Sequence, residues 1–249
     1  MQLRLSTWQE IEQRLGHDTG ILIPIGSTEQ HGPTGLIGTD VICPEVIAQG
    51  VAEQHDVLVG PTLAVGSAQH HLSFAGTITL RPSTLLAVVR DVVQSLAHHG
   101  FQKVLFINGH GGNIATISAA FSEVYAESSL RGGTAAVQCR LHSWWQGTRV
   151  THLREKLYGE REGDHATCSE ISLTQYAYPQ SIKQATLTGI APAYTGIFDA
   201  QDYRQRYPDG RIGSDPRSAC PEHGRLLFEA AVADVAEVFA AFKAGRSMC

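Results

Sequence analysis

Two loops of the sequence carry residue types that bind metal ions, and each loop follows a short apolar segment. The first loop contains Glu29 and His31, separated by one residue, and ends near Asp40. In an extended segment, residues i and i+2 point the same way, so Glu29 and His31 can face one cavity. Carboxylate oxygens together with imidazole nitrogens suit zinc, manganese or iron better than a metal that prefers thiolates. This loop is therefore a candidate metal site.

Non-metal interpretations of the same residues stay open. Asp40 precedes a predicted helix, and its carboxylate is a suitable N-cap. Glu29 and His31 taken singly are compatible with a solvated surface loop. Their combination directly after a buried strand favours the metal interpretation.

The second loop places His110 between glycines, in the stretch Asn108-Gly109-His110-Gly111-Gly112-Asn113. We expect Asn108 and Asn113 to hold this turn by side-chain hydrogen bonds. One alternative is a tight turn with an incidental histidine, and another is a phosphate cradle at a helix N-terminus. The loop lacks the Lys-Ser/Thr of a P-loop and the spacing of a dinucleotide fingerprint, which disfavours phosphate.

A third group contains His165 and Glu170, in Asp164-His165-Ala166-Thr167-Cys168-Ser169-Glu170. If a helix begins near His165, the two side chains lie about a turn and a half apart and both reach a cavity at the helix start. The alternative is a capping histidine followed by a solvated Glu170. The chain has 12 histidines, which prompts a search for metal chemistry, although neighbouring pairs such as His70-His71 need not be ligands.

The elements that must position these residues follow from hydrophobic patterning. The predicted strands cover 21–26, 56–60, 76–80, 103–107 and 134–140, and Pro24 indicates a strand end or interruption. The predicted helices cover 6–16, 41–54, 83–99, 114–130, 165–176 and 221–243. The stretch 148–166 reads as polar and irregular, and 192–216 as a long functional loop or an oligomer contact. Alternating strands and helices predict a mostly parallel sheet covered on both faces, with ligands beyond the carboxyl ends of its strands.

Bulk properties narrow the class of protein. The 249 residues are 43% hydrophobic and 17% charged, with a net charge of −5, and no linker divides them, so we expect one globular domain over 1–249. Nothing suggests a nucleic-acid surface, and no apolar run reaches the roughly 18–20 residues that span a bilayer. Five scattered cysteines and no signal peptide lead us to expect a reduced, soluble, cytoplasmic protein.

The three motifs together resemble the successive signatures of the creatininase family. They are Glu29-Gln30-His31-Gly32-Pro33 with Thr39-Asp40, the stretch from Asn108 to Asn113, and the stretch from His165 to Glu170; Gly213-Ser214-Asp215-Pro216 resembles a later family segment. The resemblance implies a three-layer α/β/α sandwich with a mainly parallel central sheet. It also implies a homohexamer and two divalent metal ions per chain, with zinc favoured and manganese or iron as alternatives.

The resemblance also assigns roles to residues. It implies that Glu29 and His110 bind one metal, that His31 binds the other, and that Asp40 bridges them. Creatinine-hydrolysing members have a glutamate at the position of Gly112, and in the Gly-Gly branch the later motif, here Glu170, supplies that carboxylate. His165 matches the catalytic histidine and would relay a proton to the leaving nitrogen.

The expected function is a metal-dependent amidohydrolase that cleaves a cyclic or linear amide C–N bond of a small molecule with a metal-activated water. Gly112, and the lack of a family tryptophan at 159–162, argue against creatinine itself. Trp144 and Asp164 are candidate substrate contacts, although Trp144 is equally compatible with an ordinary core position. One alternative is a deformylase or peptidase-like amide hydrolase in cofactor biosynthesis. An alternative of another class is a ligand-binding module without catalysis.

Overall fold

The computed structural model describes residues 1–246, so the last three residues of the predicted 1–249 domain, Cys249 among them, lie outside the described part. Its sheet has three parallel strands in the order β1 (Gly20–Ile25), β2 (Lys103–Asn108) and β3 (Gln138–Ser143). Register pairs Ile25 with Asn108 and Asn108 with Ser143. The carboxyl ends of all three strands therefore meet at one edge, where the loops that follow them are neighbours.

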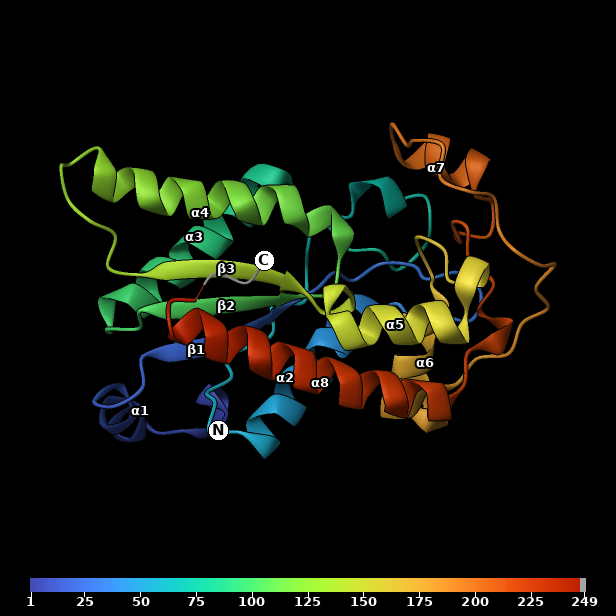
Figure 1. Cartoon of the computed structure of the whole chain (residues 1–249). Helices are drawn as coiled ribbons and strands as arrows, with labels where there is room; N and C mark the ends of the chain where they lie inside the picture. Colours follow the sequence, from blue (N-terminus) through green and yellow to red (C-terminus); the bar gives the residue numbers. More distant parts are fainter. Residues whose placement is uncertain (247–249) are drawn as a thin grey trace.

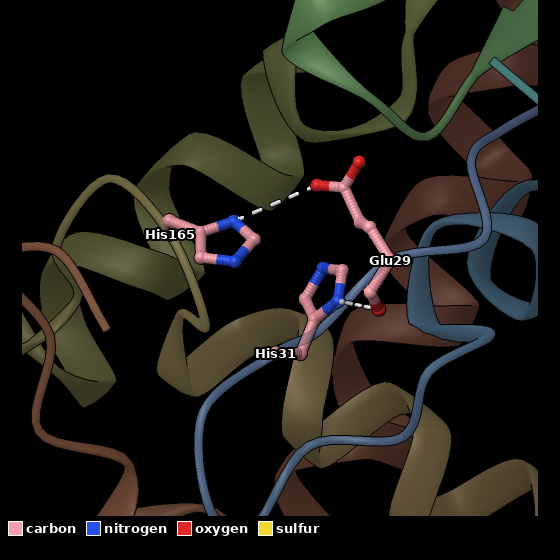
Figure 2. A group of neighbouring side chains, drawn as sticks. All are labelled: Glu29, His31 and His165. Atoms are coloured by element: carbon pink, nitrogen blue, oxygen red, sulfur yellow. Dashed lines mark hydrogen bonds and ion pairs between the residues drawn. The ribbon is translucent and has the colours of Figure 1, made fainter. Parts of the chain in front are cut away.

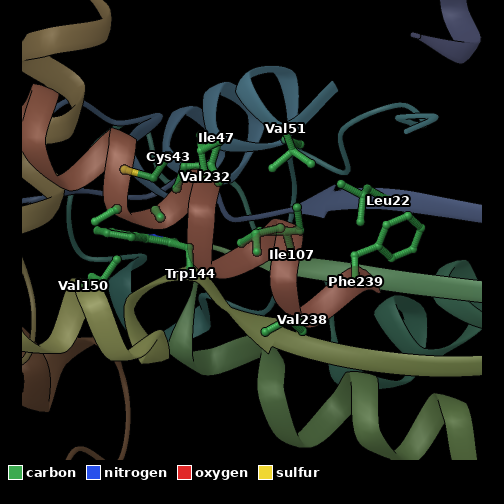
Figure 3. Close-up of a cluster of buried hydrophobic side chains, with 14 of the residues drawn as sticks. Leu22, Cys43, Ile47, Val51, Ile107, Trp144, Val150, Val232, Val238 and Phe239 are labelled. Carbon is green, nitrogen blue, oxygen red and sulfur yellow. The ribbon is translucent and has the colours of Figure 1, made fainter. Parts of the chain in front are cut away.

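Helices cover both faces of this sheet (Figure 1). Helices α3 (Pro82–His98) and α4 (Ile114–Ser129) pack on one face, and α2 (Thr39–Gln54) and α8 (Pro221–Lys243) on the other. Side chains of a strand alternate between faces. Ile21 and Ile23 accordingly join the core under α3 and α4, while Leu22 joins Val51 and Phe239 in the other core (Figure 3). The predicted three-layer α/β/α sandwich with a parallel central sheet is confirmed.

Two predicted strands are reduced to isolated bridges. The segment predicted as 56–60 runs beside β1 and bridges it at Val59, but Pro24 has no N–H to continue the ladder, which resumes only at the bridge between Ile25 and Leu63. The segment predicted as 76–80 makes one antiparallel bridge, between Ile78 and Thr28. The strand predicted at 134–140 is also shifted, because β3 begins at Gln138.

The helices near the carboxyl edge differ most from the prediction. The stretch 148–166 is not irregular, because α5 (Thr148–Leu157) forms within it. Helix α6 (Cys168–Ala177) begins three residues after His165, which instead lies in an extended segment bridged to Ile212. The predicted loop 192–216 contains α7 (Ala200–Arg206), while α1 (Trp8–Leu15) forms within the range predicted for the first helix.

Within residues 1–246, no helix combines the length and the apolar character that crossing a membrane requires. The four described cysteines, at positions 43, 139, 168 and 220, are all free thiols.

Candidate metal centre

Asp40 occupies the middle of the site. It lies in the first turn of α2, whose N-cap is Gly38, and that cap makes no side-chain hydrogen bond. The capping interpretation of Asp40 is therefore wrong. Its carboxylate lies between two imidazoles, with Oδ1 3.0 Å from His31 Nε2 and Oδ2 3.0 Å from His110 Nδ1. One carboxylate facing two rings with different oxygens has the arrangement of a bridging ligand.

Two glycines allow the strand ends to approach Asp40 so closely. A Cβ on Gly26, after β1, would lie 2.1 Å from the Asp40 carbonyl oxygen, and one on Gly109, after β2, would lie 1.9 Å from it. Neither residue has a positive φ. These glycines are therefore required by close backbone approach and not by an unusual conformation.

A hydrogen bond to the backbone leaves one ring nitrogen of His110 without a hydrogen. Its Nε2 donates to the carbonyl of Ser67 at 3.0 Å, so in the neutral ring Nδ1 carries the lone pair. Nδ1 lies 3.2 Å from Glu29 Oε1 and 3.0 Å from Asp40 Oδ2. Asn108 holds the loop as predicted, because its side chain bonds the backbone of His110 at both N–H and C=O.

His31 follows the same pattern with its nitrogens exchanged. Nδ1 donates to the backbone carbonyl of Glu29 at 3.2 Å, and Nε2 faces Asp40 and, at 3.9 Å, Glu170 Oε1. Metal-binding histidines commonly donate their second N–H to a carbonyl, which fixes the tautomer. Glu170 also closes a capping box with Thr167 at the start of α6. The capping interpretation and contact with the cluster therefore both hold for Glu170.

Two overlapping ligand sets emerge. Glu29, Asp40 and His110 form one, and His31, Asp40 and Glu170 form the other; within each set one ligand atom per residue lies within 4.8 Å of the others. Both carboxylate oxygens of Glu29 and Oδ2 of Asp40 are buried without a hydrogen-bond partner. Burying an unpaired carboxylate is strongly unfavourable, so these oxygens fit cations. Such N and O donors fit zinc, manganese or iron.

The electrostatics of the metal-free cluster lead to the same conclusion. Burial disfavours the imidazolium form, but Asp40, Glu170 and Glu29 outweigh it and raise the pKa of His31 to about 10. Burial raises the pKa of Glu170 to about 7 despite the nearby charge of His31. In the metal-free protein, protons on His31 and Glu170 therefore offset the buried negative charge that metal cations would otherwise offset.

His165 lies beside Glu29 and His31, one residue from each set (Figure 2). Its Nδ1 is 4.0 Å from Glu29 Oε1, and its ring is 4.5 Å, centroid to centroid, from that of His31. Glu29, His31 and His165 form a third group with ligand spacing, so the geometry alone permits His165 as a ligand. Ala166, directly after it, has φ = 53°, the one positive value at a non-glycine among the described residues. This strained backbone turns the chain from His165 into α6.

Sequence reasoning missed His71 and Gln30. His71 is buried, with Nε2 3.1 Å from Glu29 Oε1 and Nδ1 3.0 Å from the Gln30 amide nitrogen. The pair His70-His71 carries no ligand spacing of its own, and Gln30 is not a ligand type. Only the position of Gln30 between Glu29 and His31 offered a signal.

Two cavities open on the centre. The larger, of about 440 Å³, is lined by His71, His110 and His165 and by apolar residues that include Tyr194, Ile197 and Phe198. The smaller, of about 180 Å³, reaches Asp40 and Glu170 and is lined by Trp144 and Arg154.

Both predicted substrate contacts line these cavities. Asp164 is exposed and borders both. Trp144 borders the smaller cavity, yet it is only 2% exposed and packs in the core (Figure 3), so the core interpretation also holds.

Comparison with known proteins gives matches along nearly the whole chain. The family model described as creatininase, creatinine amidohydrolase, matches residues 4–239. Creatinine amidohydrolase of Pseudomonas putida is 28% identical over 242 residues, covering 93% of each chain. Mycofactocin precursor peptide peptidase of Mycobacterium ulcerans (strain Agy99) is 35% identical over 124 residues, covering 46% of this chain and 49% of the relative. A solved structure titled as a manganese creatininase has a TM-score of 0.85 at 27% identity, covering 95% of this chain and 96% of the other; a Zn-Zn type mutant creatininase gives 0.83, with the same identity and coverage.

Proposed function

Because the chain belongs to the creatininase family, we propose that it is a dinuclear metal-dependent amidohydrolase, a hydrolase acting on C–N bonds other than peptide bonds. The single observation that carries this proposal is the carboxylate of Asp40, shared between two sets of ligand atoms. A ligand-binding module without catalysis would not need a histidine beside both sets.

We assign one divalent cation to Glu29, Asp40 and His110, and a second to His31, Asp40 and Glu170. Zinc is the favoured ion and manganese the next, because solved creatininases are described as Zn-Zn and manganese forms. Iron fits the same donor atoms. When bound, such a pair lowers the pKa of a water molecule and polarises an amide carbonyl. Glu29, Asp40 and Glu170 offset the positive charge of that pair.

The remaining residues act on the substrate. His165 lies at the junction of the two cavities, where it can pass a proton to the leaving nitrogen, which is otherwise a poor leaving group. We assign Glu170 a second, catalytic role, in which its carboxylate contributes negative charge beside the attacking water. Asp164 and Trp144 are assigned as substrate contacts on the cavity walls.

The substrate we propose is a small-molecule amide other than creatinine. At Gly112 a Cβ would lie 2.4 Å from His110 Nε2 and 2.7 Å from the Ser67 carbonyl, so the glutamate of creatinine-hydrolysing members does not fit here. The larger cavity falls within the roughly 300–1,000 Å³ typical of ligand sites. Its apolar wall favours the second candidate, a deformylase or peptidase-like activity on a bulkier amide, which the mycofactocin peptidase relatives also support.

We further propose that the enzyme is cytoplasmic and forms a homohexamer, as the family resemblance implies. Exposed apolar side chains such as Leu5, Trp8 and Phe198 are available for contacts between subunits. Light scattering of the purified chain measures the number of subunits directly.

Metal content per chain tests the proposal. We expect close to two ions in the wild type, fewer in Glu170→Ala, and two in His165→Ala with little turnover. Glu10→Ala is a matched control, because it removes an equivalent capping box on α1 far from the cluster. Activity is assayed on creatinine, N-formyl amines and short peptides. A wild type that binds no metal after reconstitution would contradict the proposal, and metal loss in His165→Ala would make His165 a ligand.

A further inference from the structure

Gln30 lies between two histidines that border the metal centre, and it contacts them with different groups. Its backbone carbonyl is 2.8 Å from His165 Nε2. Its side-chain nitrogen is 3.0 Å from His71 Nδ1 and also 3.0 Å from His165 Nε2. Gln30 and His71 are only 6% and 2% exposed, so water does not compete freely for these contacts.

The orientation of the Gln30 amide is fixed by its other partners. Its Oε1 accepts from the Gly32 N–H at 2.8 Å, and its Nε2 lies 2.9 Å from the carbonyl oxygen of Gly210. A flipped amide would lose the first bond and set two oxygens against each other at the second. The NH₂ group therefore faces the two histidines.

The hydrogen-bond partners of Nε2 then determine which ring nitrogen of neutral His165 carries the hydrogen. If Nε2 lacked a hydrogen, its lone pair would oppose the lone pairs of the Gln30 carbonyl at 2.8 Å. Nε2 must therefore carry the hydrogen, and the Gln30 amide cannot donate to it. Nδ1 is left bare on the side that faces Glu29 Oε1 at 4.0 Å.

The hydrogen-bond partners of His71 determine its tautomer in the same way. Its Nδ1 lies against the NH₂ of Gln30, which shares its hydrogens with Gly210 and the Tyr203 hydroxyl and cannot accept one, so Nδ1 is the acceptor and Nε2 carries the hydrogen. That Nε2 lies 3.1 Å from Glu29 Oε1. In the opposite tautomer, the hydrogen on Nδ1 would face the NH₂ group of Gln30, and the lone pair on Nε2 would face the Glu29 carboxylate. Both contacts would be repulsive.

We propose that Gln30 is a positioning residue that sets the tautomers of both histidines. Its carbonyl keeps Nδ1 of His165 free to take a proton from the attacking water and return it to the leaving nitrogen, so the ring ends neutral. Its side chain keeps the hydrogen of His71 on Nε2, the nitrogen nearer Glu29, so that no lone pair of His71 faces that carboxylate. The proton-transfer part rests on the proposed hydrolase function, whereas the tautomers themselves do not.

The test is nitrogen NMR of the zinc-loaded full chain labelled with ¹⁵N-histidine, assigned by comparison with His71→Asn and His165→Asn. We expect both rings in the Nε2–H form. In Gln30→Glu, which replaces the donor with an acceptor, His71 gains a hydrogen on Nδ1, while His165 keeps its form because the backbone carbonyl remains. Gln69→Glu places the same charge on the cavity wall and leaves the His71 tautomer unchanged.

Kinetics supply the second readout. Gln30→Glu should lower kcat on the best amide about 10- to 100-fold with little change in KM, as for other residues that orient metal ligands. A wild-type His71 with its hydrogen on Nδ1, or a His165 whose Nδ1 carries either hydrogen or zinc, overturns the proposal. Both rings as expected in a wild type that hydrolyses no amide would support the tautomers and contradict the hydrolase function instead.

Discussion

Replacing Gly109 with alanine tests whether the metal centre depends on how closely β2 approaches α2. The added Cβ would lie 1.9 Å from the Asp40 carbonyl oxygen and 2.8 Å from Pro44 Cδ, both parts of the helix backbone or of a rigid ring. Reaching an ordinary contact of 3.4 Å requires the start of α2 to move by about 1.5 Å. No rotation of a flexible side chain can relieve this clash.

A shift of that size separates the ligands. The 3.0 Å between Asp40 Oδ2 and His110 Nδ1 suits two atoms on one ion, since metal bonds of about 2.1 Å place neighbouring ligands about 3 Å apart. Moving Asp40 away by about 1.5 Å would leave it out of reach of the ion that we assign to His110. We expect metal affinity to fall at least about 10- to 100-fold and stability to fall by about 1–3 kcal/mol from overpacking.

The assay is metal content per chain after dialysis against a weak chelator, beside thermal unfolding of the metal-free protein. Gly111→Ala is the matched control, because a Cβ there meets nothing within 4 Å and the residue belongs to the same loop. It should bind metal and unfold like the wild type. A Gly109→Ala protein that retains both ions at wild-type affinity would refute the argument from close approach.

Two further predictions concern Gly112 and pH. Gly112→Glu should lose metal and gain no creatinine hydrolysis, because its side chain meets His110; two ions together with creatinine turnover would show that the loop adapts. The metal-free protein should lose stability as pH rises from about 6.5 to about 10. Below that range His70, His71 and His165 oppose the trend, because burial lowers their pKa values and they add stability as pH rises. The folded state raises the pKa of Glu170 from 4.5 to about 7 and of His31 from 6.5 to about 10, so each contributes stability at low pH that is lost as pH passes its folded value. Melting curves across that window check this, and saturating zinc should abolish the decline because cations replace the protons.

The residues proposed as ligands could be singled out in the sequence because Glu29, His31 and His110 follow strand ends and Asp40 begins a helix, whereas Glu170 was assigned only through the family resemblance. Apolar β-branched runs such as Ile21–Ile25 specify strands, and parallel strands bring their following loops to one edge. The three-layer fold follows from the same alternation. The errors were local. Pro24 interrupts the pairing of 56–60 with β1, and the capping box of Thr167 starts α6 later than the polarity around His165 suggested.

The role of Gln30 could not be predicted, because it depends on partners far away in the chain. Its side chain meets His71, Tyr203 and Gly210, which reach it from two separate loops. No periodicity or motif spacing encodes such a meeting. Only the folded arrangement shows that the Gln30 amide lies with its NH₂ group toward the two histidines.

Asp40 belongs to both sets of ligand atoms, so two ions bound as proposed would be coupled thermodynamically. An ion held by one set would orient the Asp40 carboxylate for the other set and would also withdraw negative charge from it. Occupancy of either set therefore changes the affinity of the other, and linkage requires the change to be equal in both directions. The two metal ions should therefore bind in a coupled manner. The fraction of chains that hold only one ion should depend on Asp40, and the separate affinities of the two sets should not suffice to predict it.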